Sequence, residues 1–146
     1  GGQYVSFSED DGVDVRLGGM AGSLSYSFDN GGYRLVPELR LGTGLGDDDV
    51  NFLGARATVE IERFVALSVA AEVDVGDSVY LFAKPSYANV EVEVSAGGMS
   101  ASDDDWEFGL GIGCGIRIGD SGALEVGFET YSGTDVFTIG LKFKVR

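Results

Sequence analysis

The 146-residue chain has no histidine, a single cysteine and only two prolines. Because histidine is the usual general base near neutral pH, its absence argues against an enzyme, and we expect no catalytic residue. One cysteine, Cys114, excludes a disulfide within the chain, and on an apolar strand face it is expected to be a small hydrophobe. The sequence also lacks any run of about 18 apolar residues that could cross a membrane as a helix.

Basic residues are scarce as well. The chain has 10 Lys and Arg residues against 24 Asp and Glu residues, which gives a net charge of −14 at pH 7. No basic patch is present to displace the counterions of a nucleic acid, so nucleic acid is not expected as a partner. The acids gather in predicted connections, in runs at residues 9–11, 47–49 and 103–105. The last two runs lack the spaced ligands and central glycine of a calcium loop, so we predict solvated loops, no metal site and no cofactor.

What the chain has in abundance is glycine, with 24 residues, and a two-residue alternation of side chains. In residues 106–118 the even positions carry apolar side chains, whereas the odd positions carry glycine or a charge. This period is typical of a strand with two unlike faces. Alternating glycines make room for long side chains inside a narrow barrel, so we interpret the apolar face as the outside.

Eight such strands are predicted, at about 4–8, 13–28, 33–44, 57–73, from 79 onward, 106–118, 124–129 and 137–145. Short turns near residues 30, 76 and 120 are expected at one end, and longer acidic connections, with 95–105 the longest, at the other. Pro85 argues against a regular closed barrel at its position. From Val90 the apolar residues change face, which we attribute to a bulge or to a strand that has left the lipid. Arg63 interrupts an apolar face and is predicted at the lipid headgroup level.

The alternation assigns side chains to three environments. The predicted charge network inside the barrel comprises Glu38, Arg40, Glu60, Glu62, Lys84, Glu107, Arg117, Glu125, Glu129 and Lys142. The predicted lipid-facing residues are Leu39, Leu41, Leu67, Val69, Phe108, Leu110, Ile112, Phe128, Ile139 and Leu141. The predicted interfacial aromatic residues are Tyr26, Phe28, Trp106, Tyr131 and Phe143. Each interior charge is expected to be paired, because an unpaired charge in a confined interior is costly.

Three segments carry a resemblance to a known family. They are Glu-Leu-Arg-Leu-Gly-Thr-Gly at residues 38–44, Ser-Ala-Ser-Asp-Asp-Asp at 100–105 and Thr-Ile-Gly-Leu-Lys-Phe at 138–143. The chain resembles small bacterial outer-membrane β-barrels, the porin-family or OmpA-like transmembrane domains, with the opacity proteins and OmpX as relatives. The resemblance implies an eight-stranded antiparallel up-and-down barrel in the outer membrane, with short periplasmic turns and longer extracellular loops. Members usually end in an aromatic residue, whereas this sequence ends Val145-Arg146, which raises a redesigned or trimmed chain as a hypothesis.

The function expected from this reading is a structural or adhesive membrane anchor in one domain of 146 residues. We expect a monomer in contact with membrane lipid or detergent, and an extracellular ligand bound through the acidic loops is a hypothesis. Two alternatives remain open at this point. One is a soluble lipocalin-like carrier whose apolar face lines a ligand pocket, and the other is a narrow pore of low conductance.

Overall fold

The computed structural model describes residues 1–10, 14–45, 47–52, 55–97 and 99–145. Within the strands, the side chains of residues 9, 10, 14, 15, 47–52, 55–57, 100 and 102–104 lie outside the description. The elements are β1 (Gly2–Asp10), β2 (Asp14–Ser25), β3 (Phe28–Asp29), β4 (Arg34–Gly44), β5 (Asp47–Phe52), β6 (Ala55–Asp74), β7 (Val79–Ala96), β8 (Met99–Ile118), β9 (Gly122–Thr130) and β10 (Thr134–Phe143). No helix of membrane-spanning length and hydropathy is found in the described part of the chain.

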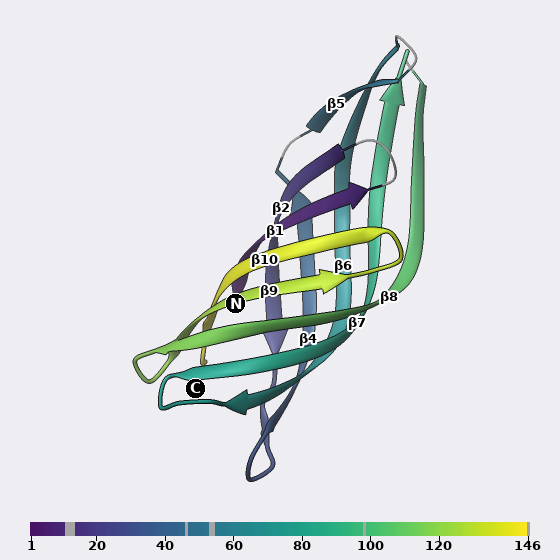
Figure 1. The fold of residues 1–146 in the computed structure, drawn as a ribbon. Coiled ribbons are helices and arrows are strands. Elements are labelled where there is room, and N and C mark those ends of the chain that lie inside the picture. The colour runs from purple at the N-terminus through teal and green to yellow at the C-terminus, as the bar shows by residue number, and fades with distance from the viewer. Residues whose placement is uncertain (11–13, 46, 53–54, 98, 146) are drawn as a thin grey trace.

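The strands close into a barrel in which every neighbouring pair is antiparallel (Figure 1). The circuit follows β1, β2, β4, β6, β7, β8, β9 and β10, and the pairing of β1 with β10 closes it. The short β3 follows β2 in the chain and pairs with β4, whereas β5 pairs with the beginning of β6. The predicted eight-stranded up-and-down barrel is therefore confirmed.

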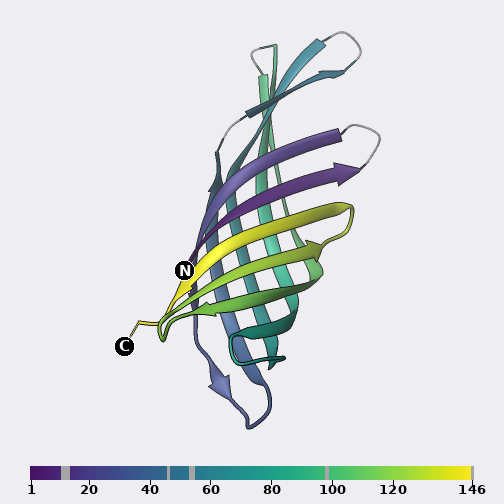
Figure 2. The same cartoon turned by 60° about the vertical axis from the view of Figure 1, so that its left-hand side comes forward.

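The two ends of the barrel differ. Both termini and the turns near residues 30, 76 and 120 lie at one end, which we call the turn end. In the turn after β3, Gly31 has a φ of 75° and its amide donates to the Asp29 carboxylate. At the opposite, outer end, β5 and the adjoining parts of β6, β7 and β8 extend beyond the other strands (Figures 1 and 2). We call this extension, formed by β5 with residues 58–63, 90–96 and 99–105, the tall wall.

The tall wall corrects the prediction of long acidic loops. Residues 95–105 were expected to form the longest connection, yet β7 continues to Ala96 and β8 begins at Met99. Val92 pairs with Asp103 and Val94 with Ala101, so ladder hydrogen bonds continue to the tight turn where Gly97 has a φ of 61°. The acidic run at residues 47–49 likewise belongs to β5. The composition of these segments indicated loops. In the structure they form strands instead, because cross-strand pairing provides hydrogen-bond partners for their backbone.

A continuous apolar belt surrounds the barrel between its two ends. The predicted lipid-facing residues lie on the outer face, from Ile139 at 40% exposed to Ile112 at 67%, except that Leu39 is only partly exposed. Cys114 lies on the same face of β8. On β8 the belt runs from Trp106 to Ile118, which at about 3.3 Å per residue and about 45° of tilt crosses about 28 Å, the thickness of a hydrocarbon layer.

Aromatic rings mark where the belt ends towards the tall wall. Tyr87 stacks on Trp106 with ring centroids 5.1 Å apart. Beyond this pair the outward positions of β7 become acidic, with Glu91 and Glu93. Arg63 lies just beyond the belt, 61% exposed, and pairs with Glu91 at 3.0 Å. The apolar belt therefore ends at the Tyr87–Trp106 pair.

A bulge in β6 lies beside the part of β7 in which the apolar residues change face. Ile61 pairs with Val92 and Arg63 with Glu91, so Glu62 is an extra residue in β6. One extra residue reverses which side chains of the strand point inward and which point outward, from the bulge onward. Ile61 and Phe64 therefore both point inward, at 5% and 2% exposed, although the alternation predicted Ile61 outside. In β7 the even positions remain inward throughout and the register with β8 is regular, so β7 itself has no bulge there. Its apolar residues change face because the outward positions beyond the apolar belt are acidic, which is the second of the two explanations offered from the sequence.

Glycines on β8 face bulky side chains, as the interpretation of residues 106–118 required. A side chain at Gly109 would overlap the Tyr131 ring, one at Gly111 the Glu129 side chain, and one at Gly115 the Tyr80 ring. Pro85 interrupts the ladder between β6 and β7, which omits Lys84 and Pro85, but its pairing with Leu110 of β8 continues. The barrel is closed despite this proline.

Candidate functional site

Six of the predicted interior charges form one connected cluster in the middle of the barrel, which we call the ionic network. Its members are Glu38 and Arg40 of β4, Lys84 of β7, Glu125 and Glu129 of β9, and Lys142 of β10. The even positions of β4 and β7 and the odd positions of β9 face inward, which brings these residues together from across the barrel.

Glu129 is the centre of the network. Its two carboxylate oxygens accept hydrogen bonds from Arg40 Nη1 at 2.6 Å and Arg40 Nη2 at 2.7 Å. Lys84 Nζ lies 2.9 Å away, and the hydroxyls of Ser86 and Tyr131 donate to Oε2 at 3.1 and 2.7 Å. Arg40 and Glu129 are 0% and 1% exposed. Such a pair is stable only because each charge is offset and hydrogen-bonded on several sides.

Lys142 links the rest of the network. Its ammonium lies 3.2 Å from Glu38 and 3.0 Å from Glu125. Tyr80 donates its hydroxyl proton to Glu125 at 2.6 Å, which adds a neutral donor to the carboxylate. The opposite charges thus alternate in space, and the side chains of the network hold one another in place.

A second cluster lies closer to the turn end. Arg34 forms two hydrogen bonds with Asp74, at 2.8 and 2.9 Å, and a third with Glu72 at 3.1 Å. Arg117 also donates to Asp74. The ring of Tyr80 lies between the two arginines, 5.6 Å from Arg34 and 5.0 Å from Arg117. Arg117, predicted as part of one network, therefore belongs to a separate group.

Three residues of the predicted network lie elsewhere. Glu60 and Glu62 are exposed on the outer face of the tall wall and not inside the barrel, because the bulge at Glu62 reverses that part of β6. With Glu93 they form a group whose carboxylate oxygens lie within 4.8 Å of one another. The Glu93 carboxylate raises the pKa of Glu62, because it accepts a hydrogen bond from the protonated Glu62 carboxyl and its negative charge disfavours ionisation. Glu107 is partly buried and lines a cavity above the network.

The predicted aromatic girdle is corrected at one position. Tyr26, Phe28, Trp106 and Phe143 are exposed on the outer surface, with Tyr26 and Phe28 in edge contact at 4.8 Å. Tyr131 instead points inward, against Gly109 and Glu129. The sequence carried this signal, because position 131 continues the odd, inward phase of Glu125, Gly127 and Glu129.

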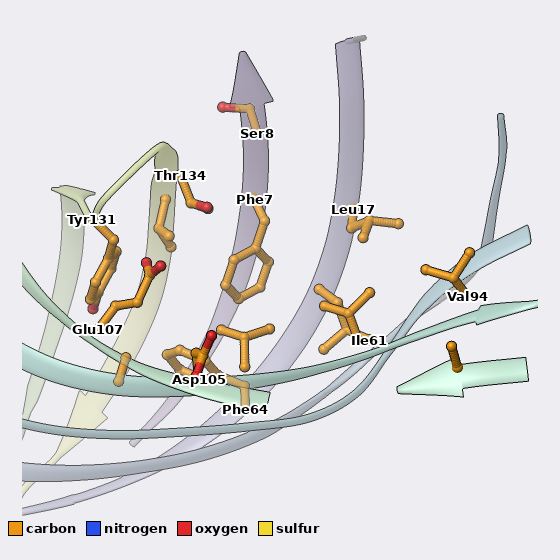
Figure 3. Close-up of a pocket in the computed structure, with 15 residues that line it drawn as sticks. Phe7, Ser8, Leu17, Ile61, Phe64, Val94, Asp105, Glu107, Tyr131 and Thr134 are labelled. Carbon is orange, nitrogen blue, oxygen red and sulfur yellow. The ribbon is translucent and has the colours of Figure 1, made fainter. Parts of the chain in front are cut away.

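Above the ionic network the barrel interior changes character and contains a cavity of about 590 Å³, the outer cavity (Figure 3). Its walls are mostly apolar, from Phe7 on β1, Ile61 and Phe64 on β6, and Val90 and Val92 on β7. Phe7 and Phe64 meet edge to face at 5.5 Å, and Phe64 lies 5.5 Å from the Arg40 guanidinium. These rings separate the cavity from the network below. The sequence did not predict the cavity, because the change of face from Val90 was attributed to a bulge or to a strand that has left the lipid, with no interior space assigned to the valines.

The fold and its outer belt define a small membrane β-barrel. Residues 1–145 match the family described as outer membrane protein beta-barrel domain, and the chain belongs to this family. It is a bacterial outer-membrane protein. The soluble-carrier alternative is therefore wrong, because the large apolar side chains that face outward lie in lipid.

Solved structures support the same fold at low sequence identity. The crystal structure of Ail, the attachment invasion locus protein of Yersinia pestis, is 13% identical, with a TM-score of 0.68 over 98% of this chain and 93% of that one. Neisserial surface protein A is 10% identical, with a TM-score of 0.64 over 99% and 94%. Ail has also been crystallised with the heparin analogue sucrose octasulfate; that structure is 12% identical, with a TM-score of 0.63 over 97% and 95%. Among curated proteins, no sequence matches this chain.

Proposed function

We propose that the protein is a closed, non-catalytic outer-membrane anchor that presents the tall wall outside the membrane for adhesive contact. The observation that carries this proposal is the change in the outer face of β7 and β8 at the Tyr87–Trp106 pair. Below it the exposed side chains are apolar, and above it the strands continue to Ala96 and Met99 with outward Glu91 and Glu93. Strands that continue beyond the lipid form a rigid surface available to a partner.

The charge of this surface favours a basic partner. Glu60, Glu62 and Glu93 crowd their carboxylates together, and a cationic group would relieve their mutual repulsion. Ail in its complex binds a polysulfated heparin analogue. An acidic wall on a chain of net charge −14 does not favour a polyanion, so we expect the partner to differ in charge from that ligand.

The ionic network supports the other half of the proposal, a barrel that does not conduct. An eight-stranded barrel encloses roughly enough space for its own side chains. Arg40, Glu129 and Lys84 occupy that space and are all at most 6% exposed. We further propose that the protein acts as a monomer, with lipid contacting the whole circumference of the belt. The narrow low-conductance pore is the rival for this part of the proposal.

Adhesion can be tested with matched charge variants in a Gram-negative host that lacks the protein. Glu60→Gln with Glu93→Gln removes two charges from the tall wall, and Asp77→Asn with Asp120→Asn removes two from turns at the turn end. We expect the first pair of substitutions to reduce adherence of the bacteria to cultured epithelial cells at equal surface expression, and the second to leave it unchanged. Equal adherence of both variants and the wild type would remove the support for an adhesive wall.

A further inference from the structure

We propose that the outer cavity is a binding site for a small organic cation with an apolar body. This inference is independent of the adhesive role, because the cavity lies inside the barrel and the adhesive surface lies on the outside of the tall wall. The proposal depends on three properties of the cavity, namely its apolar walls, its closed floor, and two carboxylates without a partner.

The apolar walls come mainly from the bulge in β6. Before Glu62 the odd residues of β6 face inward, so Ile61 joins Phe64 on the same interior surface. Opposite positions on β7 add Val90 and Val92. The ionic network lies below this surface, so the change from charged to apolar side chains produces a pocket that can bury an apolar group.

The floor of the cavity is closed by side chains with their own partners. Phe7 and Phe64 pack edge to face, and the Arg40 guanidinium beneath Phe64 is 0% exposed and held by Glu129. Arg40 is therefore not available to a ligand above the rings. The cavity is open to ligands from the outer side, where Thr134 begins β10 and Val94 lies near the end of β7.

Two carboxylates determine the charge of the preferred ligand. Asp105 and Glu107 lie at successive inward positions of β8 and both line the cavity (Figure 3). Neither carboxylate has an ion-pair or hydrogen-bond partner among the described residues, and no Lys or Arg is among the cavity's lining residues there. In the ionic network, by contrast, every carboxylate faces a cation. Asp105 is exposed and Glu107 is partly buried, so both carboxylates are accessible to the ammonium group of a bound ligand.

The volume sets the size of the ligand. About 590 Å³ lies within the range of roughly 300–1,000 Å³ that is typical of small-molecule sites. A primary amine attached to an aromatic or aliphatic body of drug size fits both the volume and the charge. A fatty acid or another anionic amphiphile would place its carboxylate next to Asp105 and Glu107, and like charges at that distance repel.

A pair of fluorescent ligands that differ in charge tests the proposal. Dansylcadaverine has an apolar dansyl body and a terminal amine, whereas dansyl-aminohexanoate has the same body and a terminal carboxylate. Each is titrated at pH 7 against the protein in lipid nanodiscs, with empty nanodiscs as the blank for partition into lipid. We expect saturable binding and a blue-shifted dansyl emission with the amine, and binding at least about tenfold weaker with the carboxylate.

Variants locate the binding site. Asp105→Asn with Glu107→Gln removes both cavity charges and should weaken amine binding by about tenfold or more, whereas Asp77→Asn with Asp120→Asn removes two charges from turns at the turn end and should not. Val92→Phe narrows the cavity and should weaken amine binding, with heat-modifiable gel migration as the check that this variant folds. Equal binding of both ligands, wild-type affinity in the Asp105 and Glu107 variant, or no saturable binding of the amine would each overturn the proposal.

Discussion

Arg40 and Glu129 lie 89 residues apart in the sequence and form a two-pronged ion pair that is fully enclosed by the barrel. The two Arg40 Nη atoms lie 2.6 and 2.7 Å from the two Glu129 carboxylate oxygens. Arg40 belongs to β4 and Glu129 to β9, on different sides of the closed sheet. The pair therefore connects strands that share no backbone hydrogen bond. Its formation depends on the correct register of every strand between them.

Breaking this pair on one side should be strongly destabilising. Glu129→Gln keeps the shape of the side chain but leaves Arg40 and Lys84 with Glu38 as their one remaining carboxylate. We expect a loss of about 3–5 kcal/mol in the free energy of unfolding, because the buried cations are then no longer fully compensated. Urea unfolding in lipid vesicles, followed by tryptophan fluorescence, measures it.

The matched control removes both partners. Arg40→Met combined with Glu129→Gln no longer leaves a buried guanidinium, so the double variant should lose less than the sum of the two single losses. Glu93→Gln on the tall wall should change the stability by at most about 0.5 kcal/mol. Additive losses would show that the two residues do not interact as the structure indicates.

The glycines of β8 offer a test of the barrel interior that does not involve charge. A methyl group at Gly113 would overlap the Phe82 ring and the Val126 carbonyl oxygen, whereas one at Gly76 meets nothing within 4 Å. Gly113→Ala should destabilise the barrel by about 1–3 kcal/mol, and Gly76→Ala, in a turn with ordinary φ, should have little effect. Boiled and unboiled samples on gels at rising temperature compare the two. A Gly113→Ala barrel as heat-resistant as the wild type would mean that Phe82 does not pack there.

Alternation of side chains carried most of the fold prediction, and single-residue irregularities caused most of its errors. The strict period in residues 106–118 placed the outer belt and the interior glycines in agreement with the structure. The extra residue Glu62 has no compositional signature, yet it moves Glu60 and Glu62 from the predicted interior to the outside. A bulge can be recognised only when the partner strand is known, because its effect is a change of pairing.

The tall wall was missed for a different reason. Residues 100–105 read Ser-Ala-Ser-Asp-Asp-Asp, which local propensity assigns to a loop, although they pair with 90–95 of β7 in regular register. Val90, Val92 and Val94 were recognised as a change of face, but the inward direction of these valines became clear only from the closed barrel. The outer cavity could not be predicted from the sequence, because its lining residues come from several strands that are brought together only when the barrel closes.

The membrane boundary assigned to the Tyr87–Trp106 pair can be measured directly, because Trp106 is the only tryptophan. In vesicles of brominated lipids, the emission of Trp106 should be quenched most by bromine near the headgroups. A ring at the headgroup level is too far from bromines near the bilayer centre for efficient quenching. A variant with Trp106→Phe and Ile112→Trp places the fluorophore in mid-belt, where deep bromines should quench it most. Deep quenching of the wild type would put the tall wall inside the lipid and contradict the assigned boundary.

The ionic network also predicts how the protein behaves in a planar bilayer. Arg40, Glu129 and Lys84 are held by several partners each, and we expect them to block a continuous water path for ions. We expect no stable steps of nanosiemens size from the wild type. Replacing all three residues with alanine removes the plug while the strands remain, and this variant should show intermittent conductance above the baseline of the wild type. The Glu93→Gln variant, which changes only the outer face, should be as silent as the wild type. Stable nanosiemens steps from the unmodified protein would mean that the network opens on its own and would favour the narrow pore.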